Sequence, residues 1–256
     1  MSAVRNWPLA ILDRAGLVAA PTYHLRNGST FHCRGRSTDL AEIVVVGTGL
    51  EYPMHLLGPL ADGALVLDIG ANIGAFSVWL SRQNWTLDLV GWAIEPYPPN
   101  LHLLQTNLTE NAVPFSVAQV AISDHDGTVA MDDTGDVDAV AVTSHGGTFS
   151  SPCVRLSTFC KDRRIESIDL LKIDIEGHEY SVLRAESAFL RSNVKVLALE
   201  WHRTNEGSRA TLVDLLSRDF EMVDARFGSG GGILIMQNRH VRTFKETGSG
   251  TAKWRI

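Results

Sequence analysis

A short apolar run followed by a turn and a helical pattern recurs along this chain, and this recurrence limits the fold most. In the first unit, residues 64–67 lead into Asp68, a loop with two glycines, and apolar residues at helical spacing from Phe76 to Leu80. Further apolar runs lie at residues 89–94, 115–122, 168–173 and 194–199. Helical patterns follow at residues 101–108, 178–190 and 208–216. Such alternation predicts an α/β fold with a mostly parallel sheet and helices on both of its faces.

The regions outside this alternation complete the predicted architecture. Residues 1–60 predict an N-terminal cap with a helix, a hairpin turn at Asn27-Gly28 and a polar stretch. Residues 61–256 form the predicted binding domain, in which 220–223 and 232–236 are expected to pair as antiparallel strands and bring the sheet to seven strands. Residues 123–153 are rich in Asp, Gly, Ser and Thr, which indicates a long insertion or short edge strands.

The overall composition excludes several classes of partner. The formal net charge of −6 argues against a nucleic-acid-coating surface, and no apolar run approaches the ~20 residues that span a bilayer. Residues 1–20 mix charged with apolar positions, as in an amphipathic helix and unlike a signal peptide. The three cysteines lack metal-ligand spacing, so we expect a reduced, cytoplasmic protein without structural zinc. The expected partner is a small-molecule substrate, and the sequence leaves the oligomeric state open.

Acidic residues end four of the five predicted parallel strands. These residues are Asp68, Glu95, Asp174 and Glu200, and the remaining strand ends at Ser123. Ligands of open parallel sheets bind outside the carboxyl ends of the strands. One acidic ending is common as a turn or cap residue, but four of them at one rim predict a binding site.

The first loop and Glu95 indicate a nucleoside-containing cofactor. Gly70 and Gly74 allow a close approach of the backbone, and a carboxylate at Glu95 suits the two hydroxyls of a ribose. Dinucleotide loops follow G-x-G-x-x-G, whereas this loop has Asn72 two residues after Gly70 and Asp68 just before it. A carboxylate near a pyrophosphate is unfavourable, but it suits the cationic groups of S-adenosylmethionine. The pattern therefore favours S-adenosylmethionine over NAD.

Several ordered blocks resemble the FkbM-type methyltransferases. The most specific block is residues 171–179, Leu-Lys-Ile-Asp-Ile-Glu-Gly-His-Glu. The other blocks are residues 66–74, 93–96, 121–124 and 199–202, with 36–39 and 51–52 upstream. The resemblance covers about residues 36–202, with one departure at Ser157, where the family often has an acidic residue.

This resemblance implies a class I methyltransferase fold of the Rossmann-like type, S-adenosylmethionine as cofactor, and O-methylation of a sugar or natural-product hydroxyl. It implies that the methionine end lies at Asp68, Gly70, Ala71, Asn72 and Gly74, the ribose at Glu95 and Pro96, and the adenine at Ile122 and Ser123. Asp174 is expected to face the methyl or amino group, and Tyr52 to close over the ligand. Residues 125–152 match nothing in the family and are expected to determine substrate choice.

The Glu200-Trp201-His202 segment suggests where the proton of a hydroxyl acceptor goes. In an extended strand, Glu200 and His202 point the same way, and Asp174 ends a neighbouring strand. His202 is then a candidate general base held by a carboxylate. Alternatively, the three residues bind a divalent metal, which is not favoured, or Glu200 and His202 only support the loop.

The predicted reaction is therefore O-methylation of a hydroxyl on a sugar, nucleoside or other natural-product small molecule. N-methylation of an amine is the close alternative. An NAD-dependent oxidoreductase and a catalytically silent binding module are the more distant ones.

Overall fold

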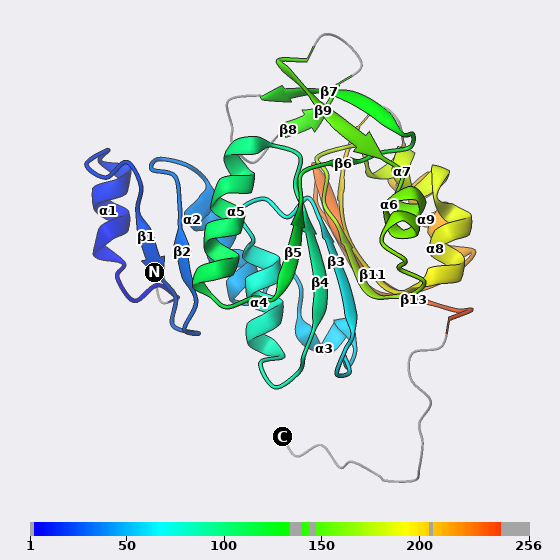
Figure 1. The fold of residues 1–256 in the computed structure, drawn as a ribbon, viewed down its shortest axis with the longest axis horizontal. Coiled ribbons are helices and arrows are strands. Elements are labelled where there is room, and N and C mark those ends of the chain that lie inside the picture. The colour runs from blue at the N-terminus through cyan, green and yellow to red at the C-terminus, as the bar shows by residue number, and fades with distance from the viewer. Residues whose placement is uncertain (1–2, 134–139, 144–146, 205–206, 242–256) are drawn as a thin grey trace.

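The structure is a computed structural model that describes residues 3–133, 140–143, 147–204 and 207–241 (Figure 1). Its centre is a seven-stranded sheet, with strand order β12-β13-β11-β10-β3-β4-β5. The strands are β3 (Leu65–Ile69), β4 (Val90–Ile94), β5 (Phe115–Ala118), β10 (Ile168–Ile173), β11 (Val194–His202), β12 (Phe220–Phe227) and β13 (Gly231–Asn238). The first five are parallel, and β12 and β13 form the expected antiparallel pair. The predicted sheet is thereby confirmed.

Alternate residues of each strand pack into two separate hydrophobic clusters, one on each face of the sheet. The first face carries Val66, Ala93, Leu170 and Ala198. It is covered by helices α2 (Asp39–Gly47), α3 (Met54–Leu57), α4 (Ala75–Gln83) and α5 (Pro98–Glu110). The second face is covered by α6 (Leu156–Asp162), α7 (Glu179–Ala185), α8 (Ser187–Asn193) and α9 (Arg209–Ser217). Both faces are buried, which explains why the strands are continuously apolar.

The N-terminal region packs on the first face. It contains α1 (Pro8–Arg14) and the hairpin of β1 (Thr22–His24) and β2 (Thr30–His32), with Gly28 at φ 93° in the turn. The region around α2 and α3 was expected to be only a polar stretch, and this was wrong. Ile43 and Val46 of α2 are buried in the same cluster as the central strands. Within the described residues, no helix is long and apolar enough to cross a membrane.

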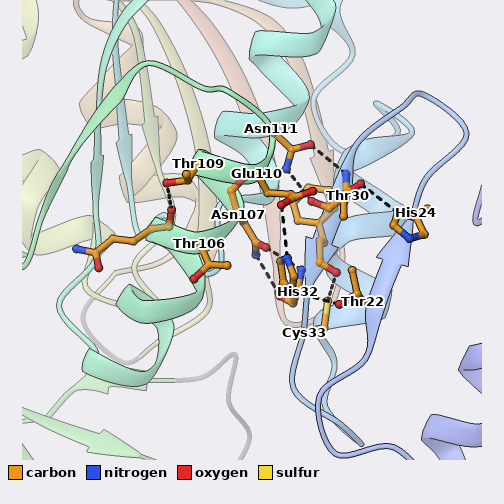
Figure 2. A network of polar contacts seen from close by, with 12 residues as sticks. Thr22, His24, Thr30, His32, Cys33, Thr106, Asn107, Thr109, Glu110 and Asn111 are labelled. Carbon is orange, nitrogen blue, oxygen red and sulfur yellow. Dashed lines mark hydrogen bonds and ion pairs between the residues drawn. The ribbon is translucent and has the colours of Figure 1, made fainter.

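Two asparagine side chains, Asn107 of α5 and Asn111 just after this helix, fasten the hairpin to the rest of the molecule (Figure 2). Asn111 accepts from the Thr30 backbone N–H at 3.0 Å and donates to its carbonyl at 2.7 Å. Asn107 does the same for His32, at 2.7 and 3.2 Å. These amides occupy the free edge of β2 as a neighbouring strand would, which satisfies backbone groups that would otherwise be exposed.

A second, four-stranded sheet lies beyond one end of the main sheet, at the top of Figure 1. Its order is β6-β9-β7-β8, with β6 (Ala121–Ile122), β7 (Gly127–Asp133), β8 (Val140–Val142) and β9 (Phe149–Val154). The prediction of one strand over 115–122 was wrong. Pairing with β4 ends at Ala118, and β6 pairs instead with β9. The expected insertion over 123–153 is therefore an ordered sheet where it is described, and residues 134–139 and 144–146 lie outside the described residues.

Two other boundaries differ from the predictions. The helix expected over 178–190 is divided into α7 and α8 at Glu186, whose buried carboxylate accepts from the backbone N–H and hydroxyl of Ser157, each at 3.1 Å. Glu186 thereby binds the first turn of α6 at Ser157, the position that departs from the resemblance noted above. The fifth predicted strand continues through His202 because Glu200 and His202 pair with β13.

Candidate active site

Polar side chains at the carboxyl ends of the strands gather on the first face of the sheet. They occupy the same alternate positions as Val66, Ala93, Leu170 and Ala198, which pack on that face. These polar residues are Asp68, Glu95, Lys172, Asp174, Glu200 and His202. The predicted gathering of carboxylates at one rim is therefore found, and strand periodicity turns them all toward the N-terminal region.

A cleft runs along this rim. Its residues are Glu42, Ile69, Gly70, Asn72, Ile94, Glu95, Pro96, Asn100, Val120, Ala121, Ile122, Met131, Val142, Asp174, Ile175, Glu176 and Glu200. The strand order β11-β10-β3-β4 sets the sequence of the polar residues along the rim, from Glu200 through Asp174 and the Gly70 loop to Glu95. Met131 and Val142 of the second sheet add apolar side chains to the lining.

The Gly70–Asn72 loop is held against both neighbouring strand ends. Gly70 has φ 73°, and a Cβ there would lie 1.6 Å from the carbonyl oxygen of Asp174. Only glycine fits this close approach. Asn72, with φ 48°, donates its backbone N–H to Glu95 Oε2 at 2.9 Å, and its own side-chain oxygen is buried without a hydrogen-bond partner. This loop therefore offers an unused acceptor in the cleft.

Glu95 is held rigidly. Its Oε1 accepts from the backbone N–H of Tyr97 at 3.0 Å and from the side-chain amide of Asn100 at 3.4 Å. Burial raises the pKa of Glu95 to about 7, against the opposing effects of these hydrogen bonds and of the Lys172 charge. The carboxylate thus has a fixed position and a pKa that makes its charge sensitive to pH near neutrality.

Lys172 is a buried cation at the centre of the rim. Its Nζ donates to the carbonyl of Gly70 at 2.7 Å and lies 3.4 Å from Asp68 Oδ1 and 3.2 Å from Asp174 Oδ2. Burial by itself lowers the pKa of Lys172, but the charges of Asp174 and Asp68 outweigh it and raise that pKa. Lys172 therefore neutralises two strand-end carboxylates and ties them to the glycine loop.

The expected cluster of Asp174, Glu200 and His202 is present. One ligand atom from each lies within 4.8 Å of the other two, so these residues could hold a divalent cation. His202 Nδ1 lies 3.0 Å from Glu179 Oε1, and its Nε2 lies 3.4 Å from Glu176 and 3.8 Å from Glu200. Asp174 and Glu200 line the cleft directly, whereas His202 is not among its lining residues.

The surroundings of this cluster raise the pKa values of both His202 and Glu200. Burial lowers the pKa of His202, but the hydrogen bond and charge of Glu179, with Glu176 and Asp174, outweigh it and raise that pKa. Burial and the charges of Asp174 and Glu51 raise the pKa of Glu200. His202 is therefore an imidazolium near neutral pH, and it must first lose a proton before it can act as a base.

Tyr52, which was predicted to close over the ligand, is buried beside Glu200. It is fully buried, its hydroxyl donates to Glu200 Oε2 at 3.4 Å, and its ring packs edge-on against Phe76 at 5.0 Å. It is not among the cleft-lining residues. Tyr52 thus supports Glu200 and does not close over a ligand in this conformation.

Four other predicted cofactor residues also lie behind the cleft. Asp68 is completely buried and accepts a hydrogen bond from the Ser77 hydroxyl at 2.6 Å. Ser123 is buried, and its hydroxyl contacts His178 Nε2 at 3.1 Å. Ala71 and Gly74 do not line the cleft, whereas Gly70, Asn72, Glu95, Pro96, Ile122 and Asp174 do. The predicted set is thus divided between lining residues and residues that hold the lining in place.

Sequence reasoning missed two residues of this site and underestimated a third. Lys172 had a detectable signal, because a lysine in an otherwise apolar central strand needs a buried counter-charge. Glu42 lines the cleft from α2, a helix that had not been predicted. For Glu179, in the first turn of a helix, structural capping was expected to be at least as likely as catalysis; it accepts from the backbone N–H groups of Ile175 and Gly177 and also holds His202.

The fold and the rim define a class I methyltransferase architecture. A family model described as "Methyltransferase FkbM domain" matches residues 68–231, which is more than half of the chain. The chain belongs to the FkbM methyltransferase family.

Comparisons with individual proteins agree with this assignment. The 31-O-demethyl-FK506 methyltransferase FkbM of Streptomyces tacrolimicus is 27% identical over 190 residues, which are 61% of this chain and 72% of that protein. The AMB antimetabolite synthetase AmbE of Pseudomonas aeruginosa is 27% identical over 198 residues, which are 62% of this chain and only 9% of the synthetase. The crystal structure of methyltransferase FkbM from Methylobacillus flagellatus superposes with a TM-score of 0.53 at 21% identity, covering 75% of this chain and 47% of that one.

Proposed function

We propose that this protein transfers a methyl group from S-adenosylmethionine to a hydroxyl of a sugar, nucleoside or other natural-product small molecule. The observation that carries the proposal is the lining of the cleft. It has apolar side chains such as Ile122 and Met131, the fixed carboxylate of Glu95, and the carboxylate of Asp174. These features suit an adenine, a ribose and a cationic methionine portion, respectively.

The residues of the cleft suit this cofactor better than a dinucleotide. Glu95 would accept from the ribose hydroxyls, and the unpartnered oxygen of Asn72 and the carboxylate of Asp174 would hold an ammonium group. A pyrophosphate in the same cleft would face Asp174, Glu176 and Glu200, with no arginine or lysine in the described lining to balance it. The predicted NAD-dependent alternative is therefore disfavoured on charge.

S-adenosylmethionine, when bound, supplies a methyl group on a sulfonium, so the chain must position the acceptor and take up its proton. Asp174 and Glu200 line the cleft and are the nearest candidates for that proton. His202 lies behind them, with Nδ1 on Glu179 and Nε2 facing Glu176 and Glu200. Because Glu200, like His202, must first lose a proton before it can act as a base, we assign the acceptor's proton to Asp174, with Glu200 and His202 as positioning residues.

Two alternatives have a specific observation behind them. The ligand-atom spacing of Asp174, Glu200 and His202 also fits a divalent cation that would polarise a hydroxyl. The acidic lining likewise suits a cationic amine, so N-methylation is the second candidate function.

Calorimetry tests the cofactor. S-adenosylmethionine and S-adenosylhomocysteine should bind in a one-to-one ratio, and NAD should give no heat. Binding of NAD without binding of S-adenosylhomocysteine would exclude the proposal. A silent binding module would bind S-adenosylhomocysteine but methylate nothing in the next experiment.

An acceptor screen tests the reaction. The protein is incubated with S-adenosyl-[13C-methyl]methionine and panels of sugars, nucleosides, polyketide alcohols and small amines, and products are read by NMR. The chemical shift of the labelled methyl distinguishes an O-methyl from an N-methyl product. Asp174→Asn should abolish turnover. Repeating the assay with EDTA and with added Mg²⁺ decides the metal alternative, because metal-assisted transfer would stop in EDTA.

A further inference from the structure

A segment of the N-terminal region packs against Glu200 behind the acidic end of the site, and an arginine from the far edge of the main sheet holds it there. The segment is residues 49–53, which joins α2 to α3. Tyr52 in this segment donates to Glu200 Oε2 at 3.4 Å, and the charge of Glu51 beside it raises the pKa of Glu200. The acidic pair of the proposed acceptor site is therefore extended by two groups that come from outside the sheet.

Strand register brings the arginine to this segment. Arg226 of β12 lies opposite Ile233 of β13, and Ile233 lies opposite Glu200 of β11. Directly paired residues point to the same face of a sheet, so the three side chains form one row on the first face. Two strand spacings separate Arg226 from Glu200, about 10 Å between their backbones. A long side chain is needed to act across that distance.

The Arg226 guanidinium contacts the segment through its backbone. Nη1 donates to the carbonyl of Leu50 at 2.6 Å, and Nη2 donates to the carbonyl of Glu51. Nε donates to Asp224 at 2.9 Å, which fixes the plane of the guanidinium. Two parallel donors to consecutive carbonyls set both the position and the rotation of a peptide, which a single ammonium cannot do.

We propose that Arg226 is a positioning residue for methyl transfer, because it holds residues 50–52 so that Glu51 and Tyr52 meet Glu200 at the acceptor site. The proposal rests on the proposed function for the identity of the acceptor site. Neither Arg226 nor residues 50–52 line the cleft that would hold the cofactor. Arg226 therefore affects the acceptor step and leaves cofactor affinity unchanged.

Fluorine NMR provides a test that needs no acceptor. The chain has four tyrosines, Tyr23, Tyr52, Tyr97 and Tyr180, so 3-fluorotyrosine labelling gives four resonances. Tyr52→Phe identifies the Tyr52 resonance, and Glu200→Gln should shift it. In Arg226→Ala the same resonance should shift or broaden while the other three remain, and Arg226→Lys should give an intermediate change.

Arg218→Ala is the matched control, because Arg218 forms an exposed pair with Asp214 at 2.8 Å at the C-terminal end of α9, away from the segment. It should leave the Tyr52 resonance in place, whereas Tyr180 lines the same pocket as Arg218 and is not used as a criterion for this variant. An unchanged Tyr52 resonance in Arg226→Ala overturns the proposal. If all four resonances of Arg226→Ala collapse because the variant does not fold, Arg226→Lys decides by the same criterion.

The acceptor found by the screen allows a kinetic test of the same proposal. Arg226→Ala should lower kcat by about 10–100-fold, as expected when a reacting group is misplaced by about 1 Å, with unchanged affinity for S-adenosylhomocysteine. A shifted Tyr52 resonance with normal kcat overturns the catalytic part of the proposal. If the screen finds no acceptor, the proposed function fails, and the NMR result still decides whether Arg226 positions the segment.

Discussion

The two faces of the seven-stranded sheet are equally buried but differ in chemistry. The second face carries Leu67, Ile94, Ile173 and Leu199 up to the ends of the strands. At the same ends, the first face carries Asp68, Glu95, Asp174 and Glu200 with Lys172 among them. Because neighbouring residues of a strand point to opposite faces, one residue separates a core position from a site position. The comparison indicates that the second face serves stability and the first face serves function, and substitutions can test that division.

The largest effect is expected from Lys172→Met. The substitution leaves Asp68 and Asp174 buried without their cation, and breaking a buried ion pair on one side typically costs about 3–5 kcal/mol. The free energy of unfolding, measured in urea, should fall by that amount. Lys172→Arg, which keeps the charge, should recover part of it. A loss below about 1 kcal/mol would show that the two carboxylates do not depend on Lys172.

Gly70→Ala should cause the next largest loss in the free energy of unfolding, and Gly63→Ala is its matched control. Both glycines have nearly the same φ, 73° and 74°, but a Cβ at Gly63 has no atom within 4 Å, whereas one at Gly70 meets Asp174 O at 1.6 Å. The conformational cost shared by both variants is about 1 kcal/mol. At Gly70, the forced separation of the loop at Gly70 from the backbone at Asp174 adds about 1–3 kcal/mol. Only Gly70→Ala should also weaken S-adenosylhomocysteine binding in calorimetry. Equal losses in both variants would mean that the close approach is not tight.

Glu95→Gln tests the predicted ribose contact. Hydrogen bonds to a charged group contribute about 1.5–3 kcal/mol, so the affinity for S-adenosylhomocysteine should fall about 10–100-fold. The backbone N–H groups of Asn72 and Tyr97 bind different oxygens of Glu95, so the variant keeps an oxygen acceptor for only one of them, and the free energy of unfolding should be measured beside the affinity. Normal affinity in Glu95→Gln would remove Glu95 from the cofactor site.

The same residue predicts a pH dependence with a definite sign. Burial places the pKa of Glu95 at about 7 in the ligand-free protein, and hydroxyl donors favour the ionised form. Binding should therefore lower this pKa and release a proton, so affinity falls as pH drops below 7, by up to about tenfold per pH unit. Calorimetry in buffers of different ionisation enthalpy measures the proton, and Glu95→Gln should abolish this component. Affinity independent of pH between 5.5 and 8 would contradict the assignment.

The sequence was sufficient to predict what depends on local pattern. Apolar runs with acidic ends located the strands and the rim, and the alternation of residues within β11 placed Glu200 and His202 together. The contacts that complete the site depend on packing between distant segments. Tyr52 meets Glu200 across 148 residues of sequence, and nothing near Tyr52 specifies that partner. Helix α2 is an intermediate case, because the spacing of Ile43 and Val46 suits one buried helix face, but the polar residues that precede them favour the prediction of a polar stretch.

The smallest effect is expected from a substitution on the second face of the sheet, directly beside the site. Ile173 is fully buried in the second cluster and precedes Asp174. Ile173→Val removes one methylene there and should cost about 0.5–1.5 kcal/mol of unfolding free energy. Because its side chain points away from Asp174 and does not line the cleft, the affinity for S-adenosylhomocysteine should stay the same. A fall in affinity comparable to that of Glu95→Gln would show that packing on the second face sets the geometry of the rim, and the division between the two faces would then fail.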